Sequence, residues 1–336
     1  MPFATESILN KMILALAFTL ISLTSVFGIN NNNFRENDFC QLSGEKHGIC
    51  RKILECPEGD RSASARCTST GQTRVVCCPI TAQALCLQVP IHRNPRAGPH
   101  VVGKTENANV GDFPFMGLLK YKDRTKRCGA ALITKKHLLT AAHCIRNGKP
   151  THVLLGINSA NDSGAEPYRI VRNVTHPKYN SLKSSNDIAI VEMAEEYDTT
   201  KEIDPLCLNG SEEDLPSNEN LTVVGWGITH TDTLVVSDIL QKGTVRTINH
   251  TSCQTNYAGV KRSITSNHLC AQGEADASGD YTDGCGGDSG GPLVRLVDSK
   301  YHLLGIVSMG HGCGLKNYPG VYTRVANYLD WIIAQL

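Results

Sequence analysis

The chain has 336 residues and a net charge of +1, because 33 Lys and Arg residues nearly balance 32 Asp and Glu residues. This balance gives no electrostatic reason to expect nucleic acid or an acidic membrane surface as a partner. The length is sufficient for about two domains of ordinary size.

The N-terminal segment is mostly apolar between residues 12 and 27 and ends in Val26-Phe27-Gly28. This pattern is typical of a secretory signal peptide, so we expect residues 1–28 to be removed by cleavage before Ile29. A transmembrane anchor is the weaker interpretation, because a spanning helix needs roughly 20 apolar residues. Met12 is an alternative start of the chain.

The chain contains 14 cysteines, an even number. Together with a signal peptide they predict disulfides in a secreted, extracellular protein. Zinc is the competing use of Cys and His, but no His-Glu-x-x-His or paired Cys-x-x-Cys motif is present, so we predict no metal site and no cofactor. Five N-glycosylation sequons fit the same compartment. Their asparagines are Asn161, Asn173, Asn209, Asn220 and Asn249.

Six cysteines crowd into the segment 40–78. They are Cys40, Cys50, Cys56, Cys67, Cys77 and Cys78. A segment of about 40 residues cannot bury enough apolar surface to fold alone, so disulfides stand in for a core. Six cysteines can pair in many ways, and sequence alone does not choose among them. We interpret this segment as a docking module. Residues 79–100 follow as a Pro-rich linker with Cys86 as its anchor.

From residue 101 onward, short apolar segments are punctuated by Gly, Pro, Asn and Asp, which predicts an all-β protein. The expected strands include residues 115–121, 129–133, 221–225 and 303–309. The end of the chain differs, because its apolar residues recur at helical spacing and predict an amphipathic helix packed on the body. Those residues are Val325, Tyr328, Leu329, Ile332 and Leu336.

Three motifs carry residues suited to nucleophilic catalysis: Leu-Thr-Ala-Ala-His143-Cys, Asn-Asp187-Ile-Ala-Ile, and Cys-Gly-Gly-Asp-Ser289-Gly-Gly-Pro. A serine between small residues can lie exposed on a tight turn, a histidine can take its proton, and a carboxylate can hold the imidazole. Each residue alone is more often a turn, cap or core residue. The three together, in this order, predict a catalytic triad of His143, Asp187 and Ser289.

These motifs resemble the chymotrypsin-like serine proteases, and the six-cysteine module with its Cys77-Cys78-Pro79 ending resembles the CLIP domain of arthropod serine proteases. The resemblance covers residues 40–78 and 101–336. It implies two antiparallel β-barrels and a C-terminal helix, with the catalytic residues between the barrels. It also implies a full set of disulfides. They pair Cys40 with Cys77, Cys50 with Cys67, Cys56 with Cys78, Cys86 with Cys207, Cys128 with Cys144, Cys253 with Cys270, and Cys285 with Cys313.

The same resemblance implies how a peptide would be bound. The backbone N–H groups of Gly287 and Ser289 would stabilise the oxyanion. Asp283 would lie at the base of a primary pocket that accepts Arg or Lys. The walls of that pocket would be Ser308, Gly310 and Gly320. Met309 stands where the family usually has Trp, which leaves selection beyond the primary residue open.

Neither calcium nor sodium is expected. Ile157 occupies the position of the first carboxylate ligand in calcium-binding relatives, and an apolar side chain cannot coordinate this cation. Pro319 occupies the position where sodium-regulated relatives carry Tyr.

Residues Val101-Val102-Gly103-Lys104 resemble the new N-terminus that forms when members of this family are cut. Its ammonium group would pair with Asp288, so cleavage would follow His100, where most relatives have Arg or Lys. A pocket built around Asp283 should handle His poorly. We therefore expect a zymogen that does not activate itself and needs an upstream protease of different specificity.

The sequence thus predicts a secreted trypsin-like zymogen with a CLIP domain at 40–78, an activation site in the linker 79–100, and a protease domain at 101–336. By resemblance, its substrate would be a downstream zymogen or ligand precursor in an extracellular cascade of innate immunity, such as Toll or melanization signalling, or of development. A serpin-type inhibitor would be a further partner.

One alternative is a non-catalytic homologue that acts as a cascade cofactor, although such homologues usually lack the nucleophile. Another is a defence peptide released from the front, which the expected bridge of Cys86 to Cys207 argues against.

Overall fold

The computed structural model describes residues 39–41, 47–52, 67, 75–79, 86, 89, 105–146, 148–198, 203–210, 215–229, 235–260, 263–275, 279 and 281–336. The chain separates into two units, Met1–Ile80 and Thr81–Leu336. The predicted signal peptide and the activation site at His100 and Val101 lie outside the described residues. Among the residues described, no helix is long and apolar enough to cross a membrane.

The small unit is an antiparallel sheet in the order β1-β2-β3. Its strands are β1 (Phe39–Gln41), β2 (His47–Lys52) and β3 (Val75–Pro79). Cys50 and Cys77, which face each other in the register of β2 and β3, are buried together with Val75. Cys50 is bonded to Cys67. Buried, disulfide-bonded cysteines therefore form much of the core of this short segment.

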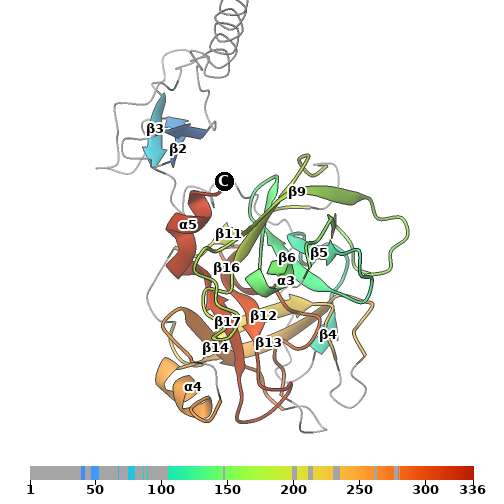
Figure 1. Cartoon of the computed structure of the whole chain (residues 1–336), viewed down its shortest axis with the longest axis vertical. Coiled ribbons are helices and arrows are strands. Elements are labelled where there is room, and N and C mark those ends of the chain that lie inside the picture. The colour runs from blue at the N-terminus through green and yellow to red at the C-terminus, as the bar shows by residue number, and fades with distance from the viewer. Residues whose placement is uncertain are drawn as a thin grey trace, which may run out of the picture. The chain divides into compact units, whose positions relative to one another are not determined.

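The first part of the large unit is a closed barrel in the order β10-β7-β6-β5-β8-β9 (Figure 1). Its strands are β5 (Met116–Lys120), β6 (Cys128–Leu132), β7 (His137–Thr140), β8 (His152–Leu155), β9 (Pro167–Thr175) and β10 (Ala189–Met193). All of its strand pairs are antiparallel. β6 and β7 are buried along their whole length, including the polar residues His137 and Thr140 at the two ends of β7.

The second barrel follows the order β16-β15-β12-β13-β14-β17 and closes through antiparallel pairing of β16 with β17. Its strands are β12 (Asn220–Gly225), β13 (Gln241–Ile248), β14 (His268–Gln272), β15 (Pro292–Val297), β16 (Lys300–Met309) and β17 (Gly320–Arg324). Two short strands extend it at its edges. They are β4 (Thr105–Asn107), which pairs with β13, and β11 (Cys207–Leu208), which pairs with β16.

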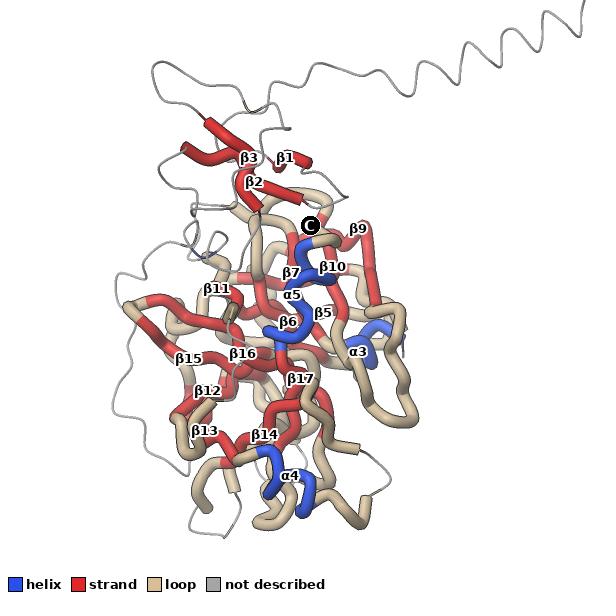
Figure 2. Tube along the Cα trace, turned by 90° about the vertical axis from the view of Figure 1, so that its left-hand side faces the viewer, coloured by secondary structure: helices blue, strands red, loops and turns tan. Residues whose placement is uncertain are grey.

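Helices are few in the described part of the chain, as Figure 2 shows in blue. They are α3 (Ala142–Arg146), α4 (His250–Asn256), the 3-10 helix η2 (Val325–Tyr328) and α5 (Leu329–Ile333). The predicted C-terminal helix is confirmed, but it begins as a 3-10 turn and ends at Ile333, before Leu336. The predicted spacing holds, since Val325, Tyr328 and Ile332 are all buried.

The predicted all-β fold of two barrels is confirmed. The expected strands at 115–121, 129–133 and 221–225 form with ends shifted by one residue, as β5, β6 and β12. β16 begins at Lys300, three residues before the predicted start, because its first residues pair with the end of β15. Polar residues at such an edge give no apolar signal in the sequence.

Candidate active site

His143 lies on α3, immediately after the buried strand β7. The disulfide between Cys128 and Cys144 ties this short helix to the start of β6. The imidazole is partly accessible, with 24% of its side chain exposed. The fold therefore fixes the backbone of this residue while leaving its side chain open to a ligand.

Asp187 lies just before β10 and has only 2% of its side chain exposed. Its Oδ2 lies 2.7 Å from Nδ1 of His143, and its Oδ1 accepts a 2.9 Å hydrogen bond from the His143 backbone N–H. A carboxylate accepts and does not donate, so Nδ1 carries the proton and Nε2 is left as the basic nitrogen. The buried carboxylate thus sets both the orientation and the tautomer of the imidazole.

The second barrel also holds Asp187 in place. Ser308 Oγ donates a 2.7 Å hydrogen bond to Oδ2, and Thr323 Oγ1 donates a 2.8 Å bond to the Asp187 carbonyl oxygen. Ser308 was expected only as a wall of the primary pocket. The Asp187 carboxylate is therefore positioned by donors from both barrels.

Ser289 lies in a tight turn between Gly287 and Gly290, whose φ angles of 98° and 77° are in the left-handed region. A Cβ at Gly290 would lie 2.2 Å from Oγ1 of Thr140, so only glycine fits there. The Ser289 carbonyl accepts a 2.8 Å hydrogen bond from the N–H of Gly129, a residue of β6 in the other barrel. The nucleophile is thus carried by the second barrel and fastened to the first.

Two of the three predicted triad residues, His143 and Ser289, border one cavity, and the third, Asp187, is hydrogen-bonded to His143. His143 and Ser289 line a cavity of about 330 Å³ together with Gly287. Among the described residues, the backbone N–H groups of Gly287 and Ser289 donate no hydrogen bond. Two such groups beside a serine can bind the oxygen of an attacked carbonyl.

Asp288, between these amides, points away from the cavity and is buried. Its Oδ1 accepts a 2.8 Å bond from Gly227 N–H, and its Oδ2 accepts a 3.1 Å bond from Cys285 N–H. Burial raises its pKa to about 6, an effect that these two hydrogen bonds oppose. No cation pairs with this carboxylate within the described part of the chain. A positive group at this place would be strongly stabilised.

Residues 102–332 match the protein family described as Trypsin. The chain belongs to the trypsin family. Its relatives include two CLIP domain-containing serine proteases of Anopheles gambiae, B9 and C9, with identities of 34% and 35% over 252 and 240 residues. Another is the human Transmembrane protease serine 11B, 40% identical over 240 residues. These matches confirm the resemblance to arthropod CLIP-domain proteases. They cover 68%, 67% and 67% of this chain, and 61%, 65% and 53% of the three relatives, so the chain spans less than two thirds of each.

The region that forms the primary pocket in the trypsin family lies beside the nucleophile. Asp283 is half-buried and its Oδ2 accepts a 3.2 Å bond from Gly314 N–H. The disulfide between Cys285 and Cys313 joins the two segments that carry these residues. A Cβ at Gly320, which is predicted to be a wall of this pocket, would lie 3.1 Å from the Tyr322 hydroxyl.

Met309 does not form the flat aromatic surface that a Trp side chain would form at this position. It is only 8% exposed and packs in an apolar cluster with Tyr257, Ile264 and Val321. The next residue, Gly310, has no side chain. The wall at this place is therefore lower than an indole would make it.

The remaining disulfides follow the predicted pairs wherever both partners are described. The structure forms Cys86–Cys207, at 1.96 Å between the sulfurs, and Cys253–Cys270, at 1.93 Å. Cys77 and Cys78 are also disulfide-bonded, but their predicted partners Cys40 and Cys56 have side chains outside the described residues. The groups of His and Cys that come close enough for a metal involve the bonded sulfurs of Cys86–Cys207 and Cys128–Cys144, which cannot act as thiolate ligands.

The predicted glycosylation sites stay predictions. Asn161, Asn220 and Asn249 are exposed, whereas Asn173 and Asn209 are half-buried. The Asn249 side chain caps α4 by accepting a 2.8 Å bond from Ser252 N–H. Ile157, the residue expected to exclude calcium, is buried.

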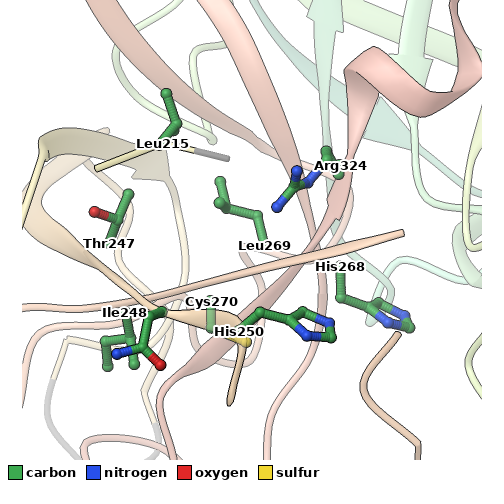
Figure 3. A pocket seen from close by; sticks show the side chains of 9 residues that line it. Leu215, Thr247, Ile248, His250, His268, Leu269, Cys270 and Arg324 are labelled. Carbon is green, nitrogen blue, oxygen red and sulfur yellow. The ribbon is translucent and has the colours of Figure 1, made fainter. Parts of the chain in front are cut away.

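A second, smaller pocket of about 60 Å³ is lined by residues of the second barrel and of the segments next to its strands (Figure 3). His250, His268 and Arg324 are among the residues that line it. The Nε2 of His268 lies 3.3 Å from the Ser184 carbonyl, and burial lowers the pKa of His268. This histidine is therefore a neutral structural residue near the segment that leads to Asp187.

The sequence patterns did not reveal four further residues that line the catalytic cavity. They are Tyr121, Lys126, Arg127 and Val236. The signal was present as a run of basic residues in 120–127, Lys-Tyr-Lys-Asp-Arg-Thr-Lys-Arg. Only the structure shows that this loop borders the triad.

Proposed function

We propose that this chain is a secreted serine endopeptidase, made as a zymogen, that cleaves protein substrates after Arg or Lys. The observation that carries the proposal is that His143, hydrogen-bonded to Asp187, and Ser289 line one cavity together with Gly287. The backbone N–H groups of Gly287 and Ser289 donate no hydrogen bond within the described residues. Membership of the trypsin family supports the same chemistry.

In this mechanism Ser289 Oγ attacks the scissile carbonyl while Nε2 of His143 takes its proton. The oxyanion forms opposite the amides of Gly287 and Ser289. The imidazolium is stabilised by Asp187, which does not take the proton itself. His143 then returns the proton to the leaving amine, and water repeats the cycle on the acyl-enzyme.

The preference for Arg or Lys is assigned to Asp283. Its carboxylate accepts a hydrogen bond from Gly314 N–H, and a long cationic side chain would bring it a charge partner. An aromatic side chain has no charge to pair with this partly buried carboxylate.

Activation is assigned to cleavage between His100 and Val101. The buried Asp288 carboxylate supports this assignment, because it needs a cation that no described side chain supplies. The new ammonium group of Val101 would pair with it and set the turn that carries Ser289. Since Asp283 does not suit His, the activator would be a protease of other specificity.

We place the enzyme in an extracellular cascade of arthropod immunity or development, with a downstream zymogen or ligand precursor as substrate and a serpin-type inhibitor as a regulator. The similarity to CLIP-domain proteases supports this placement. A non-catalytic cofactor is the alternative, but the intact hydrogen bonds between His143 and Asp187 favour an enzyme.

The test uses the full chain with a specific processing site in place of the bond before Val101. After cutting, hydrolysis of an Arg peptide amide should exceed that of the matching Phe peptide amide. The reason is that only Arg can pair with Asp283. Initial rates at equal substrate concentration measure the preference.

Ser289→Ala is the control for a contaminating protease, since it should abolish turnover. Asp283→Ser should remove the preference for Arg while Ser289 still reacts with a general serine-directed reagent. A correctly cut chain that hydrolyses neither peptide would contradict the proposal and favour the cofactor.

A further inference from the structure

The catalytic cavity has a basic wall that the mechanism does not use. Lys126 and Arg127 line it with His143, Gly287 and Ser289. Both are half-buried, so their positions are restricted by the fold. They come from the loop between β5 and β6.

This wall lies on the side of the leaving group. The residues assigned to the primary pocket, Asp283, Gly310 and Gly320, do not line the cavity. A substrate whose carbonyl lies at Ser289 sends the residue before the scissile bond toward Asp283. The chain after the bond must then leave in the opposite direction, through this cavity.

The loop carries more positive charge than its surroundings neutralise. Residues 120–127 contain five Lys or Arg residues and one Asp, in a chain whose net charge is only +1. The exception, Asp123, accepts hydrogen bonds from Thr125 N–H and Oγ1 at 3.0 Å and 2.6 Å within the loop's own turn. Within the described residues, no ion pair joins Lys126 or Arg127 to a carboxylate.

The cations also act on one another. The pKa of Lys120 is lowered by burial and then by the charges of Arg127 and Arg124. Arg127 itself is held across the cavity, because its Nη1 donates a 3.3 Å hydrogen bond to the Ser237 carbonyl, next to Val236. The nearest acidic residue on that segment, Asp238, is engaged by Ser159 Oγ and Asn161 N–H.

We propose that Lys126 and Arg127 select substrates with an acidic side chain among the first residues after the cleaved bond. This rests on the proposed function and deepens it, since it names the peptide class beyond the primary residue. The four residues that follow His100 in this chain are Val-Val-Gly-Lys, with no acid among them. The activation site is therefore a poor match for this wall as well as for the primary pocket.

The experiment compares quenched fluorescent peptides that are identical up to a single Arg and differ after it. One carries Glu at the second position beyond the bond, a second carries Gln, and a third carries Lys. For the cut enzyme we expect kcat/KM for Glu to exceed that for Gln by about fivefold, as for one partly exposed ion pair. Lys should be the poorest. The ratio of Glu to Gln should fall as salt rises.

The double variant Lys126→Gln and Arg127→Gln should bring the Glu to Gln ratio close to one. The double variant Arg169→Gln and Lys178→Gln is the matched control, because both residues are exposed, neither lines the cavity, and the pair also removes two positive charges. That control should keep the ratio of the unmodified enzyme.

The two proposals fail in different ways. If the enzyme cleaves all three peptides equally, or if the double variant keeps the Glu preference, the acidic selection is wrong and the protease function stands. If no Arg peptide is cleaved by a chain correctly cut before Val101, both proposals fall.

Discussion

The catalytic residues of the two barrels differ in how completely their charged groups are paired. The first barrel supplies His143 and Asp187, whose hydrogen bonds are complete in the uncut chain. The second barrel supplies Ser289 on a glycine turn, and within the described residues no cation pairs with the buried Asp288 of this turn. In such a protease the His143–Asp187 pair would already be formed before activation. Cleavage would then change only the turn that carries Ser289.

The largest effect is expected from Asp187→Asn, which disrupts the hydrogen-bonded pair of His143 and Asp187. Oδ1 faces the His143 backbone N–H and must remain an acceptor, so the new amide group would occupy the Oδ2 position. It would donate to Nδ1 and force the proton of His143 onto Nε2, which could no longer accept from Ser289. We expect kcat of the cut enzyme to fall about 10⁴-fold.

Initial rates on an Arg peptide measure this loss. Asp162→Asn, an exposed exchange on the same barrel, should leave the rate unchanged. An Asp187→Asn enzyme with a rate near that of the unmodified enzyme would show that the carboxylate does not set the tautomer.

A somewhat smaller effect is expected in the nucleophile turn, from Gly287→Ala. Gly287 has φ of 98°, and a Cβ there would lie 2.9 Å from Gly227 Cα. The backbone must shift, and the shift displaces an N–H group assigned to the oxyanion. We expect a loss of about 10² to 10³ in kcat with little change in KM.

Gly286→Ala is the matched control, because a Cβ at Gly286 meets only the flexible end of Ile228 at 3.0 Å and its φ is not positive. Steady-state kinetics of the two variants separate an oxyanion effect from a general loosening of the turn. Equal losses in both would contradict the special role of Gly287.

Features that depend on neighbouring residues could be predicted from the sequence, whereas contacts between distant segments could not. The triad, the strand segments and the C-terminal helix follow from local patterns, since a buried strand or a glycine turn is encoded by its own residues. Ser308 and Thr323 as partners of Asp187, and Lys126 as a wall of the cavity, could not be found that way. These contacts join segments far apart in the chain, and only the closed barrels bring them together.

The smallest expected effect concerns the stability of the uncut chain and tests whether Asp288 lacks a cation. Its folded pKa of about 6 lies above the ordinary value of 3.8, so the folded state holds this proton more tightly. The contribution of this group to stability therefore decreases as pH rises from about 4 to 6 and stays low above that. Two pKa units correspond to a penalty of about 3 kcal/mol at most.

Urea unfolding of the uncut Ser289→Ala chain at pH 4 and pH 7, with and without Asp288→Asn, isolates this contribution. The asparagine variant should lose less stability than its parent between the two pH values, whereas Asp330→Asn, an exposed exchange, should behave like the parent. After cleavage before Val101 the parent should be the more stable of the two at pH 7. The ammonium group then pairs with Asp288, and the asparagine variant cannot form that pair. If the uncut parent and the Asp288→Asn variant show the same pH dependence, a cation already neutralises Asp288, and cleavage must activate the second barrel by another route.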